Sequence, residues 1–145
     1  MVVFDATILL ILFSPDVAPP RDPATDNPVE GARERIDYLV QQLEKNRTKI
    51  IVPTPALSEI LVRAGTAGPG YLSQITGSAA FRIASFDTRA AIEVAAMTRA
   101  AIDGGDKRGG AEGHWSKIKY DRQIVAIAKT EGALTIWFLS RIGAY

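Results

Sequence analysis

Three acidic residues lie at the edges of apolar segments that are far apart in this chain. Asp5 follows the run Val-Val-Phe, Glu59 follows Pro-Ala-Leu-Ser, and Asp121 precedes Arg-Gln-Ile-Val-Ala. Two of them come after strand-like runs, and the third opens an apolar helical pattern. In a parallel α/β sheet such positions meet at the carboxyl ends of the strands, where ligands bind. Three converging carboxylates without Cys or His indicate a hard divalent cation such as Mg²⁺ or Mn²⁺.

Hydrolysis of a phosphodiester bond is the chemistry that fits such a cluster. The reaction needs an activated water and stabilisation of charge on the phosphate and the leaving oxygen, and carboxylate-bound metal ions supply both. Each acid also has a structural explanation, because an acid at a helix start caps amides and favours the helix dipole. Asp121 can be explained as a helix N-terminal residue and Glu59 as a solvated helix residue. The order and spacing of all three favour the metal site.

Composition predicts one globular domain spanning residues 1–145, because 47% of the residues are apolar. The net charge of +1 is too small to indicate a nucleic-acid binder by bulk electrostatics. The chain has no cysteine, which excludes disulfides, thiolate zinc sites and a cysteine nucleophile. His114 is its one histidine, which excludes a site with several His ligands.

The amino-terminal segment does not match a targeting signal. Residues 2–13 are mostly apolar, but Asp5 interrupts them and no basic residue precedes them. The run is also too short to span a bilayer. We therefore expect no membrane association and a cytoplasmic protein.

The elements that must position the acids alternate between strands and helices. Strands are predicted at residues 2–4, 49–52, 81–86 and 134–138. Helices are predicted at 6–13, 28–45, from 55 to the break at 65, 71–75, 88–102 and from 115 or 120 to 131. Asn27 before Pro28, Thr54 before Pro55, and Asp87 are expected N-caps, and Gly132 is an expected C-terminal stop. This alternation predicts a parallel sheet with helices on both faces.

The segments around the three acids resemble the motifs of PIN domains. They are FDATILL at the amino terminus, VPTPALSEIL in the first third and KYDRQIVAIAKTEGA near the end, with FDTRAA as a weaker fourth landmark. The chain looks most similar to VapC-type ribonuclease toxins and related bacterial PIN proteins. The resemblance implies a three-layer α/β/α fold with a central parallel sheet of about four or five strands.

The resemblance also implies an activity and a site. The chain would be a metal-dependent endoribonuclease in which Asp5, Glu59 and Asp121 bind Mg²⁺ or Mn²⁺ and help to position the attacking water. Thr7 matches a hydroxyl position often found at such sites, where it holds a carboxylate or a water. Arg122, beside Asp121, is a candidate contact for the phosphate backbone. RNA is the implied substrate, and a small antitoxin protein and a homodimer are the implied partners.

One stretch departs from the PIN pattern. These proteins usually carry a fourth acid just after the last strand, but residues 136–145 contain neither Asp nor Glu. Leu139 or Ser140 stands at about that position, and Ser140 is a candidate supporting residue. The departure favours binding of one metal ion over two. It also motivates an alternative function, a catalytically degenerate PIN module that binds RNA or a protein partner.

Three further features carry alternatives. Basic residues gather in the last third of the chain, either to attract phosphates or as a solvated face: Lys107, Arg108, Lys117, Lys119, Arg122 and Lys129. Trp115 stacks on a base or, in the interpretation that we favour, packs against the core. An alanine stripe within residues 90–101 indicates close helix packing, either inside the domain, which we favour, or in a dimer.

A phosphatase of the haloacid dehalogenase type is a competing enzyme class. The opening FDAT resembles that family, in which an Asp attacks phosphorus. That pattern needs a second Asp two residues further on, where this chain has Thr7, and no lysine motif stands in the right context. The ribonuclease interpretation therefore ranks ahead of it.

Overall fold

The centre of the molecule is a parallel sheet. The computed structural model describes residues 1–22 and 24–137. Its strands are β1 (Val2–Phe4), β2 (Ile50–Pro53), β3 (Phe81–Ala84) and β4 (Thr135–Trp137). They lie in the order β3-β2-β1-β4, and every neighbouring pair is parallel. The predicted α/β class is confirmed, with four strands in the described part of the chain.

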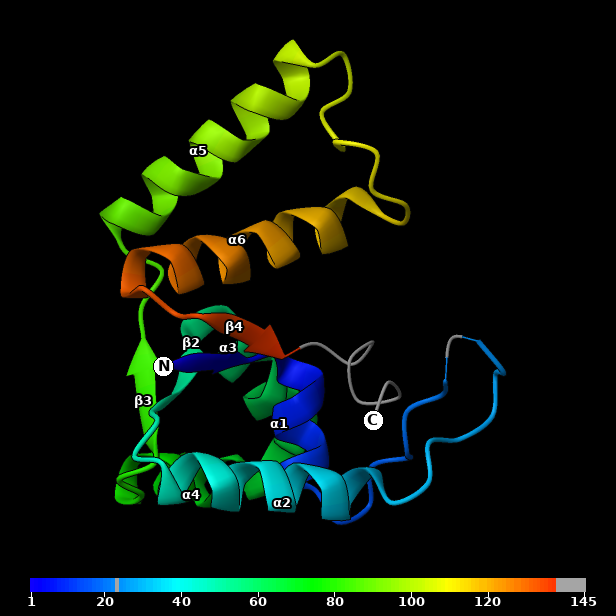
Figure 1. The fold of residues 1–145 in the computed structure, drawn as a ribbon, viewed down its shortest axis with the longest axis vertical. Helices are drawn as coiled ribbons and strands as arrows, with labels where there is room; N and C mark the ends of the chain where they lie inside the picture. Colours follow the sequence, from blue (N-terminus) through cyan, green and yellow to red (C-terminus); the bar gives the residue numbers. More distant parts are fainter. Residues whose placement is uncertain (23, 138–145) are drawn as a thin grey trace.

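Helices cover the sheet on two sides. They are α1 (Ala6–Phe13), α2 (Ala32–Lys45), α3 (Thr54–Ala64), α4 (Gly68–Gly77), α5 (Thr88–Asp103) and α6 (Trp115–Glu131), with a short 3₁₀ turn, η1 (Gly65–Ala67). In Figure 1, α6 and α5 lie above the sheet, and α2 and α4 lie below it. This arrangement agrees with the predicted three-layer α/β/α fold.

Strand β1 has a special position in the sheet. Val2 pairs with Ile50 of β2 on one side and with Thr135 of β4 on the other. The chain moves outward from β1 to β2 and β3, and β4 then joins the opposite side of β1. In open α/β sheets, a reversal of this kind opens a crevice at the carboxyl ends of the strands, where ligands bind. The residue that follows β1 at this edge is Asp5.

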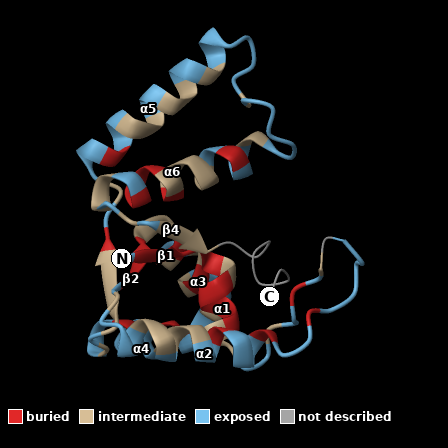
Figure 2. Cartoon of the chain, viewed as in Figure 1, coloured by how far each residue is buried: buried red, intermediate tan, exposed pale blue. Residues whose placement is uncertain are grey.

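The core lies between the sheet and the helices packed on it. Every residue of β1 and β2 is buried, as expected for strands covered on both faces. Figure 2 shows buried segments concentrated on these strands and on α1, whereas α5 is largely exposed. The large side chains with almost no exposure are Phe4, Ile8, Leu9, Ile36, Ile50, Ile51, Ile60, Ile75, Ile124 and Ile127.

Several helix boundaries form as predicted. The Asp87 carboxylate accepts a hydrogen bond from the Ala90 amide at 3.0 Å and so caps α5. Gly132 ends α6 in the left-handed conformation, with φ of 70°. Asp5 caps α1, so the helix at 6–13 begins where the sequence predicts. Capping chemistry is local, which is why the sequence alone could place these ends.

The prediction that α2 starts at Pro28 is wrong. The helix begins at Ala32, after Gly31 in the left-handed conformation, and ends at Lys45 as expected. Pro28 instead forms an isolated antiparallel bridge with Arg21. The Asp22 amide donates to the Asn27 carbonyl at 2.8 Å in the same small turn. These backbone bonds hold the segment extended and delay the helix by one turn.

Thr54 also has a different role from the predicted one. Pro53 is the N-cap of α3, and the Thr54 hydroxyl makes no capping bond. The hydroxyl instead accepts a hydrogen bond from the Phe86 amide at 3.0 Å. This bond engages the backbone just beyond β3, which ends at Ala84 rather than at the predicted Phe86. It ties the start of α3 to the segment that enters α5.

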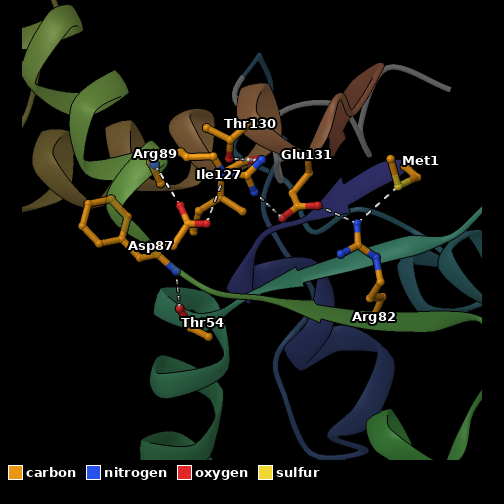
Figure 3. A network of polar contacts seen from close by, with 10 residues as sticks. Met1, Thr54, Arg82, Asp87, Arg89, Ile127, Thr130 and Glu131 are labelled. Atoms are coloured by element: carbon orange, nitrogen blue, oxygen red, sulfur yellow. Dashed lines mark hydrogen bonds and ion pairs between the residues drawn. The ribbon is translucent and has the colours of Figure 1, made fainter.

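A polar network joins α5 and α6 to the sheet edge (Figure 3). Glu131, at the end of α6, accepts a hydrogen bond from Arg82 of β3 at 2.7 Å. Its other carboxylate oxygen lies 3.8 Å from Arg89 in the first turn of α5. Arg89 also pairs with Asp87 at 3.3 Å. Glu131 therefore ties α6, β3 and α5 together.

Most of the alanine stripe is exposed, so the favoured interior position is wrong for it. The less exposed side of α5 carries Ala90, Val94, Met97 and Ala101, and of these Ala90 is fully buried. Exposed positions on α5 include Ala91, Ala95, Ala96 and Ala100. The physical reason is that α5 lies outside α6 and is covered on one face (Figure 1).

Within residues 1–22 and 24–137, no helix has the length and hydropathy needed to cross a membrane.

Candidate functional site

The three predicted acids line one pocket. Its volume is about 450 Å³, and it lies among the end of β1, α3 and α6. We call it the acidic pocket, and its lining residues are Asp5, Ala6, Thr7, Glu59, Ser116, Lys117, Tyr120 and Asp121. The fold thus brings together residues that are more than 50 positions apart in the sequence.

Asp5 is the deepest of the acids. The residue is 9% exposed, and it is the one buried charged residue in the described part of the chain. Its carboxylate accepts a hydrogen bond from the Ile8 amide at 3.0 Å, which fixes its orientation at the start of α1. The pKa of Asp5 is raised from 3.8 to about 6, mainly because the carboxyl is buried and to a smaller extent because Asp121 and Glu59 lie nearby. The Ile8 amide and Lys117 oppose that shift in the pKa.

Asp121 lies on α6 at the mouth of the pocket, with its side chain 39% exposed. Both of its carboxylate oxygens lie 3.2 Å from the Lys117 ammonium, one turn earlier on the helix. Lys117 therefore neutralises Asp121 in this structure.

Glu59 approaches from α3, also with 39% of its side chain exposed. Arg63, one turn later, lies 3.8 Å from its carboxylate. The exposed Arg63 is a loose partner, because an ion pair at this distance between solvated groups contributes little stability. Glu59 is thus the acid least fixed in place.

Tyr120 places a buried hydroxyl between these acids. The hydroxyl has no hydrogen-bond partner of good geometry among the described residues. Burial raises its pKa, as do Glu59 first and then Asp5 and Asp121. A buried polar atom without a partner is costly, so this hydroxyl needs an acceptor. Glu59 is the candidate acceptor, because after burial it contributes most to the raised pKa of the phenol.

The donor set fits a hard divalent cation in its chemistry. It offers three carboxylates and the hydroxyls of Thr7 and Ser116, and it lacks sulfur and imidazole ligands. In their present positions, no three His, Asp or Glu side chains within residues 1–22 and 24–137 are grouped closely enough to enclose one ion. Asp121 and Glu59 are instead turned to Lys117 and Arg63. Binding of a metal ion by Asp5, Glu59 and Asp121 therefore stays a prediction.

Arg122 lies outside the acidic pocket. Its guanidinium donates to the Thr98 hydroxyl at 3.2 Å and to the Lys107 carbonyl at 2.6 Å. It also lies 5.4 Å from the centre of the Trp115 ring, and the Lys107 ammonium lies 4.8 Å from the same ring. Arg122 and Trp115 thus hold the loop between α5 and α6, and both side chains are engaged within the protein.

The remaining predicted residue, Ser140, lies outside the described residues, as does Leu139.

Two residues of the pocket were not identified from the sequence, and a third residue, Lys117, was not assigned to the pocket. Ser116 and Tyr120 were not singled out, and Lys117 was grouped with the basic residues of the last third. With Asp121, they follow the spacing of one helix face, at positions 116, 117, 120 and 121. That periodicity, applied backward from Asp121, would have found them.

A second hollow, of about 550 Å³, lies beside α2. Its lining is largely apolar and includes Ile8, Ile36, Leu39 and Trp137. It contains one acid, Glu34, and therefore offers no set of converging carboxylates.

Comparisons with known proteins support the fold. No protein-family model matches the sequence, and no curated protein matches it significantly. A chain in the crystal structure of VapBC2 from Rickettsia felis, bound to a DNA fragment from their promoter, superposes with a TM-score of 0.59. The match covers 94% of this chain and 86% of that chain at 14% sequence identity. At this identity the likeness shows a common fold, which agrees with the resemblance in the sequence motifs.

Proposed function

We propose that this chain is a metal-dependent endoribonuclease of the VapC-like PIN type. The observation that carries the proposal is the convergence of Asp5, Glu59 and Asp121 on one pocket at the carboxyl end of the sheet. The fold shared with a chain of the VapBC2 structure supports the same class of protein.

The residues that would hold Mg²⁺ or Mn²⁺ are the three acids. When bound, such a cation supplies positive charge for the phosphate and lowers the pKa of a bound water. The side chains of the pocket must orient the bound groups. Asp5 is oriented by the Ile8 amide, so it is the fixed point of the cluster. Glu59 and Asp121 are partly exposed and can change partners as the site fills.

Hydroxyl groups complete the polar lining of the acidic pocket. Thr7 and Ser116 are placed to orient a water or a phosphate oxygen. The Tyr120 hydroxyl is available to hold Glu59 in one position. Lys117 lines the pocket from α6 with an exposed side chain and adds positive charge there, which attracts a phosphate backbone.

The direct test is cleavage of a mixed set of structured and single-stranded RNAs in Mg²⁺ or Mn²⁺. We expect wild type to cleave, and Asp5→Asn and added EDTA each to abolish cleavage. Asp37→Asn, a change at an exposed acid on α2, is the matched control and should cleave as wild type does. Cleavage that survives both Asp5→Asn and EDTA would refute the proposal.

A degenerate PIN module is the second candidate function. It is favoured by the absence, in the described part of the chain, of three acids close enough to enclose one ion. It would bind RNA or a protein partner without hydrolysis. RNA binding by folded protein, without cleavage under any metal condition, would support this candidate over the first.

Protein partners form part of the proposal. The fold neighbour comes from a structure described as VapBC2 bound to promoter DNA, and we propose a small antitoxin-like partner for this chain as well. The exposed face of α5 supports a homodimer, because Ile92 is 65% exposed and lies beside exposed alanines. Light scattering of wild type and Ile92→Glu tests the dimer, which the substitution should dissociate.

A further inference from the structure

We propose that Lys117 is an internal counter-ion of the acidic pocket, which a divalent cation must displace in order to bind. The inference rests on the proposed metal-dependent function and describes how the same site is regulated. It assigns to Lys117 a role in setting the concentration of metal at which the site fills.

The contacts of Lys117 place its charge among the acids. Its ammonium lies 3.2 Å from each oxygen of Asp121, so it covers the carboxylate edge that would face a cation. It also favours the ionised form of Asp5, which lies deeper in the same pocket. One lysine thus serves two of the three acids, and Arg63 lies near the third, Glu59.

Helix energetics do not explain a lysine at this position. Lys117 is the third residue of α6, and the first turn of a helix favours negative charge because the amide dipoles point their positive ends there. No acid lies in that first turn. In the ion pair of Lys117 and Asp121, the lysine comes first in the sequence. A pair four residues apart on a helix is more stabilising when the acid comes first. The interaction that favours Lys117 here is with the acidic pocket.

Lys117 is also easy to displace. Its side chain is 70% exposed, so the ammonium can return to water by rotation about its own bonds. Ion pairs between exposed groups contribute little net stability, so a cation that binds several carboxylates at once can outcompete this one. The fixed acid, Asp5, does not need to move in that exchange.

The consequence is a threshold in metal affinity. An ammonium a few ångströms from a divalent cation repels it even in a water-like dielectric, by an amount that corresponds to roughly tenfold in affinity. Removing the lysine charge also frees both oxygens of Asp121, so the cation no longer competes with an ammonium group for them. Lys117→Met should therefore bind the cation roughly tenfold more tightly than wild type.

The experiment is a titration with Mn²⁺ alone, without RNA, in which electron paramagnetic resonance measures the free ion. Wild type, Lys117→Met and Lys119→Met are compared at low ionic strength. Lys119 lies on the same helix and is exposed, but it does not line the pocket. Its variant loses the same charge and should bind Mn²⁺ within about twofold of wild type, because its charge is farther away and screened. Circular dichroism checks that each variant is folded.

Three outcomes would overturn the inference, and they are distinguishable. If wild type binds Mn²⁺ and folded Lys117→Met binds it equally or more weakly, Lys117 is no competitor, while the proposed metal dependence stands. If neither protein binds Mn²⁺ at millimolar concentration, the metal-dependent function itself fails and the inference fails with it. Tighter binding by both lysine variants would mean that bulk charge, and not the position of Lys117, sets the affinity.

Discussion

Replacing Asp5 with Asn should stabilise the metal-free protein at neutral pH. Asn retains the N-cap of α1, because its side-chain oxygen can accept the hydrogen bond from Ile8. It removes a buried charge whose pKa is raised from 3.8 to about 6. At about 1.4 kcal/mol per unit of pKa, ionised Asp5 costs the folded state about 3 kcal/mol.

The sign of the pH dependence follows from the direction of that shift. Between about pH 4 and pH 6 the folded state holds the Asp5 proton that the unfolded state releases, so this group destabilises the fold as pH rises. Above pH 6 the cost is complete, and below pH 4 it vanishes. The gain from Asp5→Asn should therefore reach about 3 kcal/mol at pH 7.5 and be near zero at pH 4.

Urea unfolding in EDTA at pH 4.0 and pH 7.5 measures this difference. At roughly 2–4 °C per kcal/mol for a domain of this size, the melting temperature should also rise at pH 7.5 by about 6–12 °C. Asp37→Asn is the control for loss of one negative charge. An Asp5→Asn protein that is no more stable than wild type at pH 7.5, or that gains equally at both pH values, would refute the reasoning.

Saturating Mn²⁺ should reverse the order of stability at pH 7.5. A ligand that binds only the folded state stabilises it by about 4 kcal/mol at a thousand times its dissociation constant, which exceeds the difference of about 3 kcal/mol between the two proteins. Wild type should gain this amount, whereas Asp5→Asn, which lacks the fixed carboxylate, should gain little. An equal gain by both proteins would mean that Asp5 does not bind the ion.

Three further predictions concern the elements around the site. Glu131→Gln should lower the free energy of unfolding by about 1–2 kcal/mol in urea, because the carboxylate shared by β3 and α5 loses its charge; an unchanged value would contradict the network. Gly132→Ala should cost about 1 kcal/mol in the same assay, since its φ of 70° disfavours any side chain, whereas Gly77→Ala should not destabilise. Trp115→Ala should speed tryptic cleavage at Lys107 several-fold, because the ring no longer holds that loop, and unchanged cleavage would argue against this role.

Local signals in the sequence predicted most of the architecture. The cap at Asp87 and the stop at Gly132 each depend on one or two neighbouring residues, and both form as predicted. The start of α2 could not be predicted in this way. Pro28 is a good first helical residue, but a backbone bridge to Arg21 decides its conformation.

The candidate site was also predicted only in part from the sequence. The sequence marked the three acids, and the fold brings them to one pocket. It did not reveal that Lys117 turns toward Asp121 or that the Arg122 guanidinium turns away to Lys107. The pair of Lys117 and Asp121 is a contact between residues four apart on one helix, which helical spacing allows. The direction of Arg122 depends on the loop that packs beside α6, so it comes from tertiary structure.

The central place of β1 has a consequence for protein synthesis. This strand precedes every other element in the sequence, yet it lacks one neighbour until Thr135–Trp137 is made. At about 5–20 residues per second, ribosomes need on the order of ten seconds for the intervening chain. Asp5 leaves the ribosome well before Asp121, and its amide has no Trp137 carbonyl to bond until β4 follows. A nascent chain therefore cannot assemble the acidic pocket until α6, which carries Asp121, has left the ribosome.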